Sequence, residues 1–89
     1  MLLEIVTPER VFFRGNVEMV RVPGTMGSFA MKHNHAPIIS TLEPGLIQIK
    51  HEMNDRYFEL LEPAIVEHHE NRVIILAEKI KETIPLFVR

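Results

Sequence analysis

The chain has 89 residues, of which 46% are hydrophobic and 25% are charged, and its formal net charge is −2. This length and composition are typical of one small globular domain and exclude a disordered chain. The slight negative charge argues against nucleic-acid binding, which normally depends on a basic surface. Because the chain has no cysteine, disulfides and thiolate metal ligands are also excluded.

The N-terminal segment 1–4 lacks the basic region and the apolar run of a signal peptide. The longest apolar run, Val73–Ala77, has 5 residues, whereas a membrane-spanning helix needs about 18 or more. We therefore expect no direct insertion into a bilayer, and only indirect association with a membrane through a partner.

Turn-forming residues divide the chain at spacings of about 8–12 residues, which is typical of a sandwich or barrel of short antiparallel strands. They are Arg14-Gly15-Asn16, Pro23-Gly24, Asn34, Pro44-Gly45, Asn54-Asp55 and Glu70-Asn71. The two Pro-Gly pairs each suit a type II turn, because proline fixes φ at the second position and glycine accepts a positive φ at the third.

Between these turns, apolar residues alternate with polar ones. Residues 17–22 alternate imperfectly, 46–50 place Ile47 and Ile49 on one face, and 56–61 have the aromatic and aliphatic content of a strand. The continuous apolar run 73–77 predicts a central strand covered on both faces. After it, residues 77–82 can begin a helical turn that Pro85 would end, and the apolar segment 84–88 must cover or be covered by another element.

The residues needed for catalysis are scarce. The chain has two serines, Ser28 and Ser40, and a single aspartate, Asp55, which falls in an expected turn. No local pattern suggests a Ser-His-Asp arrangement, and the segment 24–27 has neither the spacing nor the lysine of a phosphate-binding loop. We expect no catalytic residues.

Four of the five histidines fall into two close pairs, His33 with His35 and His68 with His69. On a strand the first pair would share a face, whereas the second pair would point to opposite faces. A zinc site needs three or four converging ligands. We therefore expect no metal and no other cofactor, and we expect the histidines to form hydrogen bonds or interface contacts.

Several short motifs follow one another along the chain: 3–9 (LEIVTPE), 22–25 (VPGT), 35–37 (HAP), 44–45 (PG) and 73–77 (VIILA). In these motifs and their spacing, residues 2–79 resemble the N-terminal domain of the epsilon subunit of bacterial F-type ATP synthase. The resemblance implies an all-β fold, a ten-stranded β-sandwich of two five-stranded sheets over residues 1–79, followed by a short irregular C-terminal tail, 80–89.

The same resemblance implies a non-catalytic subunit of the central stalk, the rotor that couples the gamma subunit to the c-ring so that proton-driven rotation drives ATP synthesis. Such a subunit would lie at the cytoplasmic face of the cell inner membrane as a peripheral part of the complex. The alternative is a free-standing β-sandwich that binds a ligand, although the absence of Trp and the single Tyr57 argue against a glycan site. An inhibitor of ATP hydrolysis is a third hypothesis.

The resemblance also implies two interfaces. The residues expected to face the c-ring are Met26, Gly27, Ser28, Phe29, Ala30, Met31 and Lys32, and those expected to lie toward the gamma subunit are Thr7, His35 and Ser40. We expect Met26, Phe29 and Met31 to form a partly exposed apolar surface.

The chain departs from the family pattern in its loops. Met26 and Ser28 replace two family glutamates, and Lys32 adds a positive charge. Asn34 stands where the family has glycine, but asparagine also tolerates a left-handed conformation. The usual Ser-Gly-Gly is replaced by the segment 61–64 (LEPA).

The C-terminal end also departs from the family, whose members mostly continue into a helical hairpin that can inhibit ATP hydrolysis and in some binds ATP. The segment 78–89 is too short for two helices, since an isolated helix needs about 12–15 residues to be even marginally stable. We therefore expect no nucleotide binding and little restraint on hydrolysis. The chain is either naturally short or truncated, and the ending 80–89 favours a naturally short form.

Overall fold

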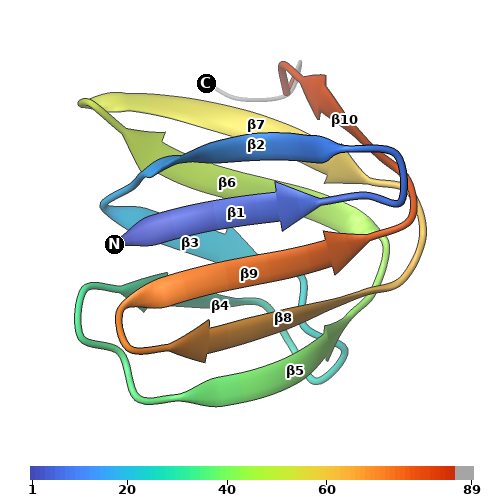
Figure 1. Cartoon of the computed structure of the whole chain (residues 1–89). Helices are drawn as coiled ribbons and strands as arrows, with labels where there is room; N and C mark the ends of the chain where they lie inside the picture. Colours follow the sequence, from blue (N-terminus) through green and yellow to red (C-terminus); the bar gives the residue numbers. More distant parts are fainter. Residues whose placement is uncertain (86–89) are drawn as a thin grey trace.

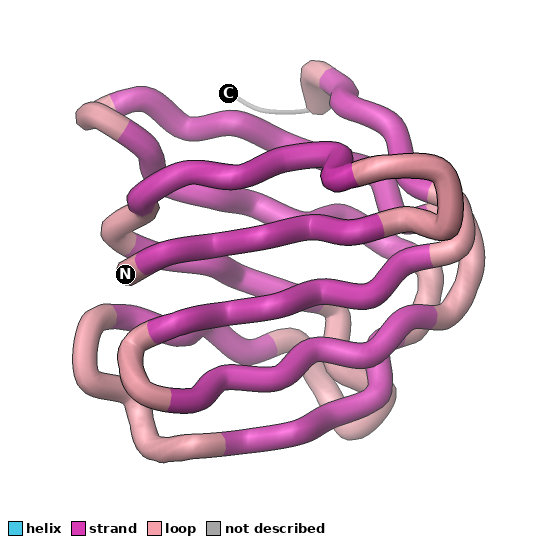
Figure 2. The backbone as a smooth tube through the Cα atoms, in the orientation of Figure 1, coloured by secondary structure: helices cyan, strands magenta, loops and turns pink. Residues whose placement is uncertain are grey.

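Ten β-strands in two sheets make up the computed structural model, which describes residues 1–85 (Figure 1). Figure 2 shows only strands and loops in this part of the chain. The strands are β1 (Leu2–Val6), β2 (Val11–Asn16), β3 (Met19–Val22), β4 (Phe29–Lys32), β5 (Ile38–Leu42), β6 (Gly45–His51), β7 (Asn54–Leu60), β8 (Ala64–His69), β9 (Arg72–Ala77) and β10 (Ile80–Thr83).

The two sheets each have five strands. The first sheet has the order β2-β1-β9-β8-β5, and the second has the order β10-β7-β6-β3-β4. Neighbouring strands are antiparallel except β1 and β9, which run parallel with Leu2 opposite Arg72. The all-β sandwich expected from the resemblance is confirmed.

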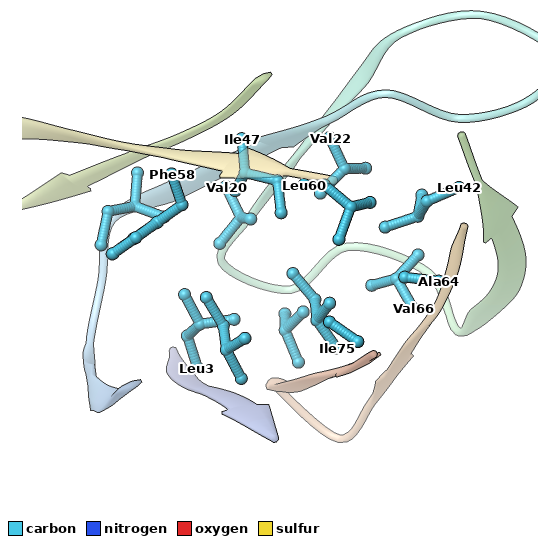
Figure 3. Close-up of a cluster of buried hydrophobic side chains, with 14 of the residues drawn as sticks. Leu3, Val20, Val22, Leu42, Ile47, Phe58, Leu60, Ala64, Val66 and Ile75 are labelled. Atoms are coloured by element: carbon cyan, nitrogen blue, oxygen red, sulfur yellow. The ribbon is translucent and has the colours of Figure 1, made fainter. Parts of the chain in front are cut away.

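The core lies between the two sheets, where most strands contribute every second side chain (Figure 3). On β6, Ile47 and Ile49 are both 0% exposed, so the prediction that they share one buried face is confirmed. Phe58 of β7 adds an aromatic cluster, because its ring packs against the rings of Phe12 and Phe13 at centroid distances of 5.6 and 5.7 Å. This packing closes the sandwich.

Strand β9 is central in its sheet, as the sequence predicts, but it is not covered on both faces. Val73 and Ile75 are 0% exposed and face the core, whereas Leu76 is 53% exposed on the outer face. The expectation of two covered faces is wrong because nothing in residues 1–85 packs over the outside of this sheet at Leu76.

The hairpin turns fall partly where the sequence predicts. Glu70 and Asn71 form the β8–β9 turn, with φ of 51° and 62°. The position predicted for the β6–β7 turn, Asn54-Asp55, is wrong by two residues. Glu52 and Met53 form this turn, with φ of 51° and 68°, and Asn54 already belongs to β7. Positive φ at both central residues matches the twist of two antiparallel strands, so strand pairing decides the position of the turn. The expected turn at 14–16 is also wrong, because those residues lie in β2.

The two Pro-Gly pairs do not form type II turns. Among the described glycines only Gly27 has a positive φ, 127°. Gly24 and Gly45 are instead needed for close packing: a Cβ on Gly24 would lie 2.7 Å from the carbonyl oxygen of Gly27, and one on Gly45 would lie 3.1 Å from Cβ of Pro23. The prediction of turn type is therefore corrected, because contact between neighbouring segments and not φ selects these glycines.

The sheet extends past the boundary expected at residue 79. Strand β10 pairs with β7, with Ile80 opposite Leu60, so the expected helical turn over 77–82 and the irregular tail beginning at residue 80 are both wrong for this segment. Strand pairing with an open edge of β7 satisfies its backbone groups better than one isolated helical turn would. Ile84 is 81% exposed, and the rest of the predicted apolar segment, 86–88, lies outside the described residues.

Arg56 on β7 attaches β10 through its side chain. Its Nε and Nη2 donate hydrogen bonds of 2.9 and 3.0 Å to the two carboxylate oxygens of Glu82. The same guanidinium lies 5.1 Å from the ring centroid of Phe13 and 5.6 Å from that of Phe58. The bond to Glu82 raises the pKa of Arg56, and the bond to Arg56 lowers the pKa of Glu82.

We predict that Arg56→Ala lowers the free energy of unfolding by about 1 kcal/mol, because it removes a bidentate ion pair and two cation–π contacts. Amide hydrogen exchange should increase along β10. Arg14→Ala is the matched control, since Arg14 makes a single 3.1 Å contact with Glu4 and its loss should have a smaller effect. Equal effects of the two substitutions, measured by chemical denaturation, would contradict the role given to Arg56.

Candidate interaction surfaces

The fold divides each of the two sets of residues expected at an interface between the two ends of the sandwich. Thr7 and Thr25 line one cavity at the first end. At the second end, the backbone N–H of His35 donates a 3.1 Å hydrogen bond to the carbonyl of Lys32. In β4 the register places Phe29 beside Val22 and Lys32 beside Met19, so the strand runs from one end to the other (Figure 1). The set expected to face the c-ring is therefore not one continuous patch.

At the first end, the segment 24–27 forms a turn that presents a bare apolar side chain. The N–H of Gly27 donates a 2.9 Å hydrogen bond to the carbonyl of Gly24, and Met26 at the tip of the turn is 99% exposed. Gly27 and Ser28 are also exposed. This turn is the most prominent part of the segment expected to contact the c-ring.

The expected apolar surface does not include Met31. This side chain is 0% exposed and belongs to the core, because it faces inward on β4. Phe29 is half-buried and packs against the core. The expectation of exposure is therefore wrong for Met31 and only partly right for Phe29.

A groove with a volume of about 600 Å³ lies beside the turn. Its walls are mostly apolar and carry three threonine hydroxyl groups. The lining residues are Val6, Thr7, Pro8, Thr25, Thr41, Leu42, Pro63, Ala64, Ile65, Leu76, Ala77 and Glu78. The hydroxyls of Thr25 and Thr41 are 2.8 Å apart and form one hydrogen bond, which ties the turn to β5.

The groove continues into an apolar row on the outer face of the first sheet. By register, Ile65 of β8 lies opposite Leu76 of β9, which lies opposite Val6 of β1, which lies opposite Val11 of β2. Ile65, Leu76 and Val11 are 45%, 53% and 54% exposed. On β5, Ile39 is 72% exposed on the same sheet. Exposed apolar patches of this kind mark interfaces.

The sequence reasoning missed this row. A continuous apolar run such as 73–77 is compatible either with a strand buried on both faces within the domain or with a strand whose outer face is buried only by another protein. Ile65 offered a signal of its own, because it alternates with the buried Ala64 and Val66 where a polar residue is usual.

At the second end of the sandwich, two histidine rings lie against each other. The rings of His35 and His68 have centroids 5.4 Å apart and meet edge to face. His35 Nδ1 lies 2.7 Å from the carbonyl oxygen of Ala36 and forms a hydrogen bond with it. His68 is 1% exposed, and neither of its ring nitrogens has a hydrogen-bond partner among residues 1–85.

The prediction that His68 and His69 point to opposite faces is confirmed, since His69 is exposed. The expectation of hydrogen-bonded histidines holds for His35 and fails for His68. Ser40 forms only a 3.3 Å bond to the carbonyl of Thr41.

Within residues 1–85, no three His, Asp or Glu side chains converge in a way that could hold a metal ion. The same part of the chain contains no helix with the length and apolar character required to cross a membrane.

Comparison with known proteins identifies the fold and the family. The family model for "ATP synthase, Delta/Epsilon chain, beta-sandwich domain" matches residues 1–83. The ATP synthase epsilon chain of Parvibaculum lavamentivorans is 36% identical over 83 residues, a match that covers 93% of this chain and 61% of that protein. The corresponding protein of Leptospira interrogans is 32% identical over 88 residues, with coverage of 97% and 68%.

Two solved assemblies contain the same fold. A chain of the mitochondrial ATP synthase of Euglena gracilis, solved as OSCP/F1/c-ring, matches with a TM-score of 0.85 at 12% identity, covering 92% of this chain and 52% of that chain. A chain of the central stalk/c-ring of the Tetrahymena thermophila enzyme matches with a TM-score of 0.76 at 15% identity, covering 90% and 64%.

The chain therefore spans 61% of its Parvibaculum relative and 58% of a relative from Anaeromyxobacter. With the family model matching residues 1–83 and all ten strands in place, this chain belongs to the family of ATP synthase delta/epsilon-chain β-sandwich domains.

Proposed function

We propose that this chain is a non-catalytic, epsilon-type component of the central stalk of an F-type ATP synthase, where it couples the gamma subunit to the c-ring so that proton-driven rotation drives ATP synthesis. It would act as a peripheral subunit at the cytoplasmic face of the inner membrane. Besides family membership, one observation carries the proposal: the groove at Thr7 continues into an uncovered apolar row in which Ile65 lies opposite Leu76.

A coupling subunit must transmit torque without deforming. Two sheets that bury a continuous core between them meet this need, because protein interiors are packed as densely as organic crystals and resist compression. Loops in this chain are short, and the segment at Met26 is tied back by the hydrogen bond between Thr25 and Thr41. The sandwich is thus suited to hold two partners at fixed positions.

The gamma subunit is proposed to cover the apolar row and the adjacent groove. Thr7 lines the groove, whereas Ser40 follows Ile39 on β5 and therefore points to the opposite face of that strand, at the edge of the contact. An interface core is normally apolar with a polar rim, and this surface has that composition. His35, at the other end, would belong to the rim of this contact or lie outside it.

The c-ring is proposed to contact the tip of the turn at Met26, Gly27 and Ser28, with Phe29 and Ala30 supporting it from β4. The buried Met31 would act only through the core. Lys32 lies at the opposite end of β4, so its charge would meet a different part of the partner. If it does face the ring, the polar loop of that ring should carry a compensating carboxylate or fewer basic residues.

The groove also keeps a ligand-binding role open as the second candidate, since its volume falls in the range of small-molecule sites. Its walls offer few polar groups besides threonine hydroxyls and Glu78, which would confer little specificity. Co-purification with the gamma subunit separates the two functions, because a free-standing binding module would not be retained.

We predict that Met26→Asp weakens assembly onto the c-ring about tenfold or more, because it buries an unpaired carboxylate in an apolar contact. Stability should hardly change, since Met26 is 99% exposed. Met53→Asp is the matched control: Met53 is 92% exposed, at the tip of the β6–β7 hairpin. Binding to rotor complexes that lack this subunit measures the difference, and equal affinities for both variants would exclude the Met26 contact.

We predict that Leu76→Lys reduces retention of the gamma subunit in co-purification, because it places a charge in the middle of the apolar row. The free energy of unfolding should fall by less than about 1 kcal/mol, since the side chain is already half exposed. Met53→Lys serves as the control. If a folded Leu76→Lys variant retained the gamma subunit as well as the wild-type chain does, the apolar row would not be part of that interface.

We predict that residues 1–89 by themselves do not bind ATP, because the family resemblance implies that the ATP site of some members lies in a C-terminal helical hairpin and not in the β-sandwich. Calorimetric titration with ATP should give no saturable heat. For the same reason, adding the chain to a catalytic head that lacks epsilon should leave the rate of ATP hydrolysis unchanged. Suppression severalfold would show that the sandwich restrains hydrolysis by itself.

A further inference from the structure

His68 is an exception in the core of the sandwich. Its side chain is 1% exposed, and its neighbours across the strands are apolar, Ile38 on β5 and Val73 on β9. Neither ring nitrogen has a partner in the described part of the chain. A buried polar group without a hydrogen bond destabilises the folded state, and it does so more strongly when it is charged.

The charged groups around His68 all oppose its protonation. Desolvation lowers its pKa from the usual value of 6.5, and His35, His69 and the terminal ammonium of Met1 lower it further, against a smaller opposite effect of the backbone of His68 itself. His35 faces it from the β4–β5 loop, while His69 is its neighbour on β8. The ammonium donates a 3.0 Å hydrogen bond to the carbonyl of Val17. No carboxylate acts on His68 from any of these elements, so a positive charge there would have no counter-ion.

The element facing His68 is the loop 33–37, which is held by few interactions. The N–H of Asn34 donates a 3.2 Å bond to Oδ1 of Asn71 in the β8–β9 turn, and the N–H of His35 bonds to Lys32. Asn34 also adopts a left-handed φ of 63°. In Figure 1 this loop lies at the same end of the molecule as the N-terminus and the β8–β9 turn. It is the part that can move away without disrupting the core.

We propose that His35 and His68 form an acid-sensitive latch, in which protonation of the buried His68 releases the loop 33–37 from the end of the first sheet. The neutral pair packs edge to face and seals this end. A cation in the same place is expelled toward water and carries the loop with it. The latch is independent of the proposed function.

The direction of the pH effect follows from the unfolded chain, which takes up a proton at His68 more readily than the folded chain does. The stability associated with neutral His68 is complete above pH 6.5 and is lost as pH falls below that value. Each pH unit below it reduces the folding equilibrium constant by about tenfold through this one group, until the folded chain also becomes protonated.

The first test compares the wild-type chain with His68→Leu, which fills a similar volume without a titratable group. Unfolding in denaturant from pH 8.5 to pH 5 gives the folding constant of each chain, and their ratio isolates His68 from the carboxylates. We expect a constant ratio above pH 7 and, below pH 6, a progressive change in favour of the variant of up to about tenfold per pH unit. A ratio that stays constant down to pH 5 would overturn the latch.

The second test needs no variant at His68. Imidazole resonances of the wild-type chain should place the pKa of His68 below the usual value of 6.5. Hydrogen exchange, corrected for its intrinsic pH dependence, should show that the amides of Asn34 and His35 lose protection on acidification before that of Phe58. A His68 pKa of 6.5 or above, or loop protection that does not change with pH, would refute the proposal.

Discussion

Each strand of this protein can bury only one face, and burial of the inner faces of two sheets against each other is the interaction on which the rest depends. The alternation is strict enough that Leu3, Ile5, Val73 and Ile75 are all 0% exposed. The parallel pairing of β1 with β9 completes the first sheet by joining its first and last strands in sequence. This packing determines the positions of the turns, of the edge strands and of the side chains that remain exposed.

This constraint explains why the outer apolar row does not belong to the core. Ile65 and Leu76 lie on the far side of the sheet from Ile75, so no rearrangement within the sandwich could bury them. Their burial requires another element. An uncovered apolar surface of this kind marks an interface, which agrees with the proposal that a partner subunit covers it.

His68 violates the same rule in the opposite direction. The inner face of β8 carries Ala64 and Val66 and then a histidine, whose ring nitrogens have no hydrogen-bond partner among residues 1–85. Residues that reduce stability without an evident structural benefit are expected at functional positions. Its pairing with His35, one of the residues expected toward the gamma subunit, makes the end of the sandwich sensitive to protons.

Local sequence determined much of the fold, because side-chain alternation and family motifs both depend on the order of residues along one strand. For this reason the sequence could predict that Ile47 and Ile49 share a buried face, that Glu70 and Asn71 form a turn, and that β9 is central in its sheet. Tertiary structure decided every feature that depends on which residue a side chain or strand meets. Met31 is buried, Leu76 is exposed on the outer face, β10 pairs with β7, and the ring of His35 contacts that of His68. The identity of an apolar or titratable residue does not specify which residue it will contact, because in a sandwich that residue comes from a strand far away in the sequence.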